Sequence, residues 1–172
     1  MRLQRGCAKE TCVMKSDSSV KTLTVEVVIK DTIAFLEEGR RVVLPVRGFS
    51  MLPFIIGGKE SVELVKPSSP LKEGDVVLAW VDGTHYVIHR IIGIDGDEVS
   101  LMGDGNIAGI EHCRTDEVSA LAEYVIAPNG KRRYLYTKTR LRFAKWWRKL
   151  LPIRRWILAI YRRTLLKLNI VI

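Results

Sequence analysis

The chain has few cysteines, no long apolar run and no acidic residue in its last quarter. Its three cysteines, Cys7, Cys12 and Cys113, lack the paired spacing of zinc sites, and no glycine-rich phosphate-binding motif is present, so we predict no metal and no cofactor. No stretch approaches the roughly 20 consecutive apolar residues that span a bilayer. Residues 1–15 also lack the apolar centre of a secretory signal, which predicts a cytoplasmic location.

The charge is distributed unevenly along the sequence. Residues 131–172 contain 14 of the 28 Lys and Arg and none of the 19 Asp and Glu. The net charge of +9 therefore comes entirely from this segment, and the rest of the chain has an excess of acid. Such asymmetry indicates an anionic partner for the basic segment, either a lipid surface or nucleic acid.

The hydrophobic pattern changes its period once, near residue 40. Apolar residues at helical spacing predict a helix over residues 22–38, with Thr22 as its N-cap and Gly39 as its stop. Beyond the helix, short β-rich runs alternate with turn sequences, which predicts a compact, mainly β domain. The expected strands are VVLPV, SVELV, DVVLAWV, HYVIHRIIGI, EVSLM and EYVIA, with hairpin turns at Asp82-Gly83 and Asp95-Gly96.

The predicted fold class is thus mainly β, with an N-terminal helix and a C-terminal amphipathic helical tail. We divide the chain into a polar, mobile N-terminus over residues 1–21, a β domain with its leading helix over 22–137, and a basic helical tail over 138–172.

Ser50 is the first candidate for chemistry, because it occupies a Gly-Phe-Ser-Met turn within VRGFSMLPFI. A serine hydroxyl is a weak nucleophile until a base takes its proton. The run YVIHRII offers His89, which on a strand shares a face with Val87 and Ile91, and apolar neighbours keep an imidazole neutral, as a general base requires. Arg90 points to the opposite face, where we expect it to pair with an acid.

Three boxes in order resemble the superfamily of signal peptidase I and the self-cleaving SOS repressors. They are Gly48-x-Ser50-Met51-x-Pro53, then His89-Arg90-Ile91, then Gly103-Asp104-Gly105-Asn106, and the match covers roughly Val42 to Val125. Bacterial signal peptidases and repressors have lysine at the position of His89. In having histidine there, the chain resembles the endoplasmic-reticulum and archaeal signal peptidases. The resemblance implies a signal-peptidase/repressor-peptidase-like β domain and serine endopeptidase activity.

The resemblance also implies roles for individual residues. Ser50 would attack the scissile carbonyl, His89 would accept its proton, and Asp104 would orient the imidazolium. The backbone N–H of Ser50 would form part of the oxyanion hole, and Met51 and Pro53 would shape the loop.

Two positions depart from the family pattern. Gly48 stands where signal peptidases often have a serine that donates to the oxyanion, and Ile110 stands where the histidine-type enzymes have a second aspartate. The acid that orients His89 therefore remains open among Asp104, Glu111 and Asp116.

The tail predicts two amphipathic helices joined near Pro152. Such helices suit a membrane surface, where tryptophans lie at the interface and cations face anionic lipid. A second interpretation is that the apolar stripes dock on the β domain, and a third, nucleic acid, lacks a recognised binding module. The residues predicted to contact a membrane are Trp146, Trp147, Trp156, Arg154, Arg155, Arg162 and Arg163.

The leading hypothesis for function is a serine peptidase that cleaves a specific peptide or protein substrate while held on the inner face of the cytoplasmic membrane. A self-processing regulator of the SOS-repressor type is the first alternative. A non-catalytic membrane adaptor with a degenerate peptidase fold is the second.

Overall fold

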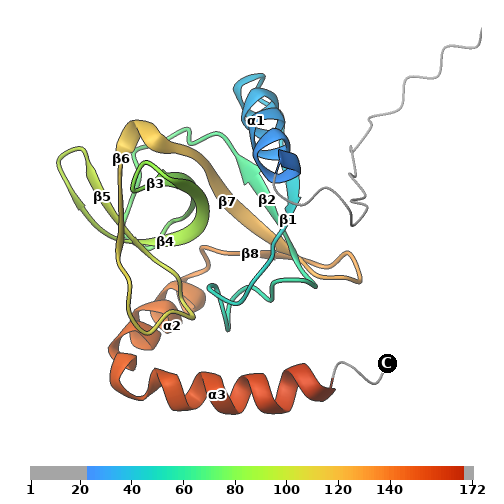
Figure 1. Cartoon of the computed structure of the whole chain (residues 1–172), viewed down its shortest axis with the longest axis vertical. Helices are drawn as coiled ribbons and strands as arrows, with labels where there is room; N and C mark the ends of the chain where they lie inside the picture. The colour runs from blue at the N-terminus through green and yellow to red at the C-terminus, as the bar shows by residue number, and fades with distance from the viewer. Residues whose placement is uncertain (1–22, 169–172) are drawn as a thin grey trace, which may run out of the picture.

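One antiparallel sheet of eight strands forms the centre of the molecule, as a half-barrel with one helix before it and two after it (Figure 1). The computed structural model describes residues 23–168, so the N-terminus over residues 1–21 and the Thr22 cap lie outside the described residues. The strands are β1 (Val42–Pro45), β2 (Ser61–Val65), β3 (Val76–Val81), β4 (His85–Asp95), β5 (Glu98–Met102), β6 (Glu111–Arg114), β7 (Val118–Ile126) and β8 (Arg132–Tyr134). The helices are α1 (Leu23–Glu37), the short 3-10 helix η1 (Thr115–Glu117), α2 (Lys138–Lys149) and α3 (Leu151–Leu168).

The sheet bends so strongly that it holds two separate cores. Its order is β1-β2-β7-β3-β4-β5-β6, with β8 also paired to β7. Figure 1 shows β3 and β4 curling tightly, with β5 to one side of them, and the backbone N–H of Asp82, after β3, donates to the carbonyl of His112 in β6 at 3.0 Å. The curl encloses one core, which contains Val77, Ala79, Val81, Ile91, Val99, Leu101, Cys113 and Val118. The larger core lies between the sheet and the helices.

Both predicted hairpin turns are confirmed. Asp82 and Gly83 have φ angles of 50° and 65°, in the left-handed region that glycine and aspartate tolerate, and with Thr84 they form a three-residue loop, since Val81 pairs with His85. In the second hairpin Asp95 pairs with Glu98, and Gly96 has a φ angle of 57°. These two turns fix the register of β3, β4 and β5, and so they determine which β4 side chains face each core.

The predicted first helix is confirmed as α1. It ends where expected, because Gly39 adopts a φ angle of 76° and its N–H donates to the carbonyl of Leu36 at 3.0 Å. Ile29 and Leu36 on its inner face are buried in the larger core. The helix therefore covers part of the sheet, and Figure 1 shows it at the opposite end of the molecule from α3.

The tail forms the two helices that the sequence predicts. Thr137 caps α2 by accepting a hydrogen bond from the N–H of Arg140, and Pro152 lies in the first turn of α3. Figure 1 shows both helices packed along the end of the molecule opposite α1. Within residues 23–168, none of the helices combines the length and the apolar character needed to cross a membrane.

Candidate functional site

His89 is buried in the middle of β4, with an exposed fraction of 5%. It pairs with Val77 of β3 on one side, and its Nδ1 atom forms a hydrogen bond with a carboxylate oxygen of Glu111 in β6. Because a carboxylate oxygen accepts hydrogen bonds, this contact favours the tautomer of His89 in which Nδ1 carries the proton. In that tautomer Nε2 is the nitrogen with the lone pair.

Glu111 is thus the acid that contacts His89, among the three that the sequence left open. The glutamate side chain is 21% exposed, so water reaches one side of the pair. Asp116 lies at the surface instead and forms an ion pair with Arg114 at 3.2 Å. The residues of β6 form no β-rich run, and for that reason Glu111 could not be ranked above Asp116 from the sequence.

Asp104 pairs with Arg90 and His89 pairs with Glu111, so the expectation that Asp104 orients the imidazolium is wrong. Its carboxylate accepts two hydrogen bonds from Nε of Arg90, at 2.9 and 3.1 Å, and one from the terminal NH2 group at 2.7 Å. Arg90 and Asp104 are each 3% exposed. Burial acts to lower the pKa of Arg90, but the charge and hydrogen bonds of Asp104 outweigh it and raise that pKa overall.

The pairing of Arg90 follows from strand alternation. Arg90 points to the opposite face of β4 from His89, as predicted, and its guanidinium lies 5.2 Å from the centre of the Phe54 ring. A second terminal nitrogen donates to the carbonyl of Gly74 at 2.7 Å. Arg90 therefore contacts three loops, which contain Phe54, Gly74 and Asp104. The expectation that it pairs with an acid is confirmed.

The Ser50 turn is held by close contacts between backbone segments. Gly48 has a φ angle of 80°, and a Cβ atom added to Gly57 would lie only 1.9 Å from the carbonyl oxygen of Gly48. Met51 and Leu52 next to the serine are fully or almost fully buried, whereas Ser50 itself is half-buried. The peptide bond before Pro53 is cis. Buried flanks therefore support a serine that is partly accessible to solvent.

The third box packs directly against this turn. The N–H of Gly105 donates to the carbonyl oxygen of Ser50 at 2.6 Å. A Cβ atom on Gly103 would lie 2.5 Å from that same oxygen, and one on Gly105 would lie 2.5 Å from the carbonyl oxygen of Phe49. Only glycine fits at these two positions, since real Cβ atoms do not approach a backbone oxygen so closely.

The strand register places this contact beside His89. Met102 pairs with Arg90 in the β4–β5 ladder, so Gly103, one residue further on, lies at the level of His89. The Ser50 carbonyl thus lies against the residues that follow β5, just beyond the pair that Met102 forms with Arg90, the chain neighbour of His89. Among the described residues, the Ser50 hydroxyl and the His89 ring form no hydrogen bond. Catalytic hydrogen bonds often shorten only when substrate is bound.

The C-terminal helices α2 and α3 donate hydrogen bonds to the backbone of the third box, residues 103–106. The indole N–H of Trp147 in α2 donates to the backbone carbonyl of Asp104 at 2.7 Å, and Arg154 in α3 donates to the carbonyl of Asn106 at 2.8 Å. Arg154 also donates to the carbonyl of Trp147 at 2.9 Å. Burial lowers the pKa of Arg154.

These contacts correct part of the predicted membrane surface. Trp147 and Arg154 are 4% and 1% exposed, so neither can contact a membrane in this structure. Both side chains donate hydrogen bonds to backbone carbonyls, and a sequence pattern does not reveal such partners. The other predicted contact residues that are described, Trp146, Trp156, Arg155 and Arg163, are exposed, and the side chain of Arg162 lies outside the described residues.

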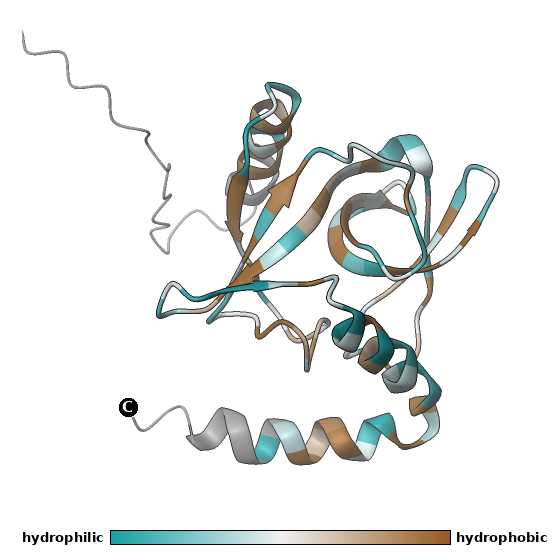
Figure 2. Cartoon of the chain, turned by 180° about the vertical axis from the view of Figure 1, so that it is seen from behind, coloured by the Kyte–Doolittle hydropathy of each residue, from teal (hydrophilic) through white to brown (hydrophobic). Residues whose placement is uncertain are grey.

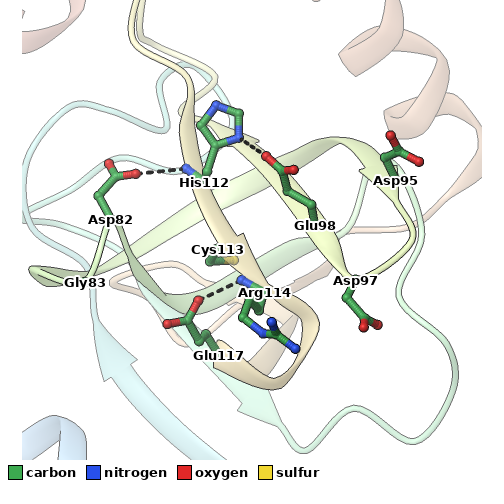
Figure 3. Close-up of a pocket in the computed structure, with 9 residues that line it drawn as sticks. All are labelled: Asp82, Gly83, Asp95, Asp97, Glu98, His112, Cys113, Arg114 and Glu117. Atoms are coloured by element: carbon green, nitrogen blue, oxygen red, sulfur yellow. Dashed lines mark hydrogen bonds and ion pairs between the residues drawn. The ribbon is translucent and has the colours of Figure 1, made fainter.

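A shallow pocket of about 560 Å³ lies elsewhere, at the far end of the curled strands. Figure 3 shows its lining of Asp82, Gly83, Asp95, Asp97, Glu98, His112, Cys113, Arg114 and Glu117. Two of the acids there already have partners within the chain. Glu98 pairs with His112, and Glu117 accepts a hydrogen bond from the N–H of Arg114. Neither Ser50 nor His89 lines this pocket.

Comparison of the chain with protein-family models and with curated proteins finds no match.

Proposed function

We propose that the protein is a serine endopeptidase in which Ser50 is the nucleophile, His89 the general base and Glu111 the acid that orients it. The observation that carries the proposal is the buried His89, whose Nδ1 atom is held by Glu111 while the Ser50 turn is fastened to the neighbouring strand end. A buried imidazole held by a carboxylate can activate a serine hydroxyl that reaches its second nitrogen. The substrate class is a peptide or protein.

The reaction follows from these atoms. The Nε2 atom of His89 takes the proton of the Ser50 hydroxyl as its oxygen attacks the carbonyl carbon of the peptide bond. The resulting imidazolium is stabilised by the Glu111 carboxylate on Nδ1. When the carbon–nitrogen bond breaks, His89 returns the proton to the leaving amine, and water then hydrolyses the ester on Ser50 with the same proton transfers.

The negative oxygen of the tetrahedral intermediate needs donors. The N–H of Ser50 is the first candidate, and Gly48 supplies no side-chain donor to assist it. Loss of one such donor costs about 3–4 kcal/mol in serine hydrolases. The proposal therefore predicts a slower enzyme than one with a serine at residue 48.

Peptide-library hydrolysis tests the proposal. Purified wild type is compared with Ser50→Ala, His89→Ala and a control, Ser100→Ala, which alters another half-buried serine on β5. We expect cleavage by wild type and the control, and loss of cleavage in the other two variants. Equal cleavage by wild type and Ser50→Ala would eliminate the proposal.

The two alternatives give different results in the same experiment. A self-processing regulator would show a shortened chain in stored wild type but not in Ser50→Ala, with no cleavage of added peptides. A non-catalytic adaptor would show neither.

A further inference from the structure

The outer face of α3 is apolar, although this helix already has a buried inner face. Leu158 and Arg154 are buried on the inner side, where the helix meets the rest of the molecule. On the outer side Ile153 is 50% exposed and Trp156 is 63% exposed, one helical turn apart. Ile160 is also exposed and falls on the same side one turn further along. The helix therefore has a buried inner side and, roughly opposite it, an outer side on which Ile153 and Trp156 are exposed to solvent.

Cations border this outer face. Arg155 lies next to Trp156, with its guanidinium 5.1 Å from the centre of the indole ring, and Arg163 is exposed two turns further on. Figure 2 shows hydrophobic and hydrophilic stretches alternating along α3. The segment over residues 131–172 contains no Asp or Glu, so the face carries no acid of its own to balance them.

We propose that the outer face of α3 binds an anionic lipid bilayer, with the helix lying flat on the membrane surface. This inference goes beyond the proposed peptidase and does not depend on it. An exposed tryptophan between aliphatic residues, with arginines at the margin, matches the interface between acyl chains and anionic headgroups.

Charge distinguishes this occupant from the others. A second copy of the chain packed through the same face would bring the arginines of both copies together without any acid from α2 or α3 between them. A nucleic acid would use the arginines but would leave Ile153 and Trp156 in water. A lipid surface satisfies both the apolar centre and the cationic margin.

The inner face of α3 determines what lies above such a membrane. Because Arg154 donates to the carbonyl of Asn106, the segment from Gly103 to Asn106 would sit about one helix diameter, roughly 10 Å, from the lipid surface. Membrane binding would thus fix the height of the residues that pack against Ser50.

Vesicle co-sedimentation tests the inference with the full chain. Wild type is mixed with vesicles of phosphatidylcholine alone or with about 30 mol% phosphatidylglycerol. An apolar double variant, Ile153→Ser with Trp156→Ser, is matched by Val27→Ser, which alters a 54% exposed residue on α1. A charge variant, Arg155→Gln with Arg163→Gln, is matched by Lys30→Gln with Lys59→Gln, which removes two exposed charges elsewhere.

We expect wild type and both controls to sediment with the anionic vesicles. The apolar variant should bind about tenfold or more weakly, and the charge variant about 10- to 30-fold more weakly, with the second loss reduced in high salt. Trp156→Phe is a conservative variant that should leave the fold intact. We expect anionic vesicles to shift the tryptophan emission of wild type to shorter wavelength, and most of that shift to be absent in this variant.

Three results would overturn the inference. Wild type could fail to bind anionic vesicles, or the apolar variant could bind as well as Val27→Ser. The third is a lipid-free dimer in analytical ultracentrifugation that the apolar variant abolishes, which would assign the face to a second copy of the chain.

Discussion

Replacing Asp104 by asparagine should destabilise the protein strongly, because it leaves the Arg90 guanidinium buried without its carboxylate. Arg90 and Asp104 are each 3% exposed and share three hydrogen bonds of 2.7 to 3.1 Å. Removing one partner of a buried pair costs about 3–5 kcal/mol, since the remaining charge stays out of water. For a domain with a total stability of about 5–15 kcal/mol, this is a large fraction.

Urea unfolding followed by circular dichroism measures the loss. A suitable control is Glu73→Gln, because Glu73 forms its 2.6 Å ion pair with Arg148 at the surface, where such pairs contribute about 0–1 kcal/mol. We expect the midpoint of Asp104→Asn to fall well below those of wild type and the control. A loss of less than about 1 kcal/mol, similar to that of the control, would refute the assignment of Asp104 to Arg90.

The same variant separates a structural role from a catalytic one. In folded protein at low temperature, Asp104→Asn should retain much of its hydrolytic rate, because His89 is held by Glu111 and not by Asp104. A rate loss as large as that of Glu111→Gln would instead return Asp104 to the catalytic group.

Three further outcomes are expected. Glu111→Gln should lower the rate of peptide cleavage about 10²- to 10⁴-fold with little change in stability, measured by steady-state kinetics, and an unchanged rate would contradict the role of that acid. Gly105→Ala should destabilise the fold and abolish activity, because its Cβ would lie 2.5 Å from the Phe49 carbonyl, whereas Gly93→Ala, with no atom within 4 Å, should be tolerated. Burial raises the pKa of the Cys113 thiol to about 11, so peptide mapping should show slow alkylation of this cysteine at pH 8 in folded protein and rapid alkylation in urea. Equal rates in both conditions would show that the thiol is accessible.

Much of the fold could be predicted from local sequence. The helix before the sheet, the two hairpin turns and the two tail helices depend on apolar spacing, on glycine and on proline, and all of these act within a few residues. β6 and β8 were missed because EHCR and RRY contain no β-rich run, and both become strands only through pairing with β5 and β7.

The site could be predicted only in part, for a related reason. Strand alternation correctly placed His89 and Arg90 on opposite faces of β4. The choice between Asp104 and Glu111 as partner of His89 depends on how β6 returns beside the curled strands, which is a contact distant in sequence. The burial of Trp147 and Arg154 has the same origin, because their acceptors are backbone carbonyls of Asp104 and Asn106.

The most direct test of the central claim is the site of covalent labelling by a serine-directed acylating probe, located by mass spectrometry. If Ser50 is activated by His89, wild type should carry one adduct, on Ser50, and His89→Ala should carry none although it remains folded. An unlabelled wild type, or equal labelling of Ser50 in both proteins, would contradict the account.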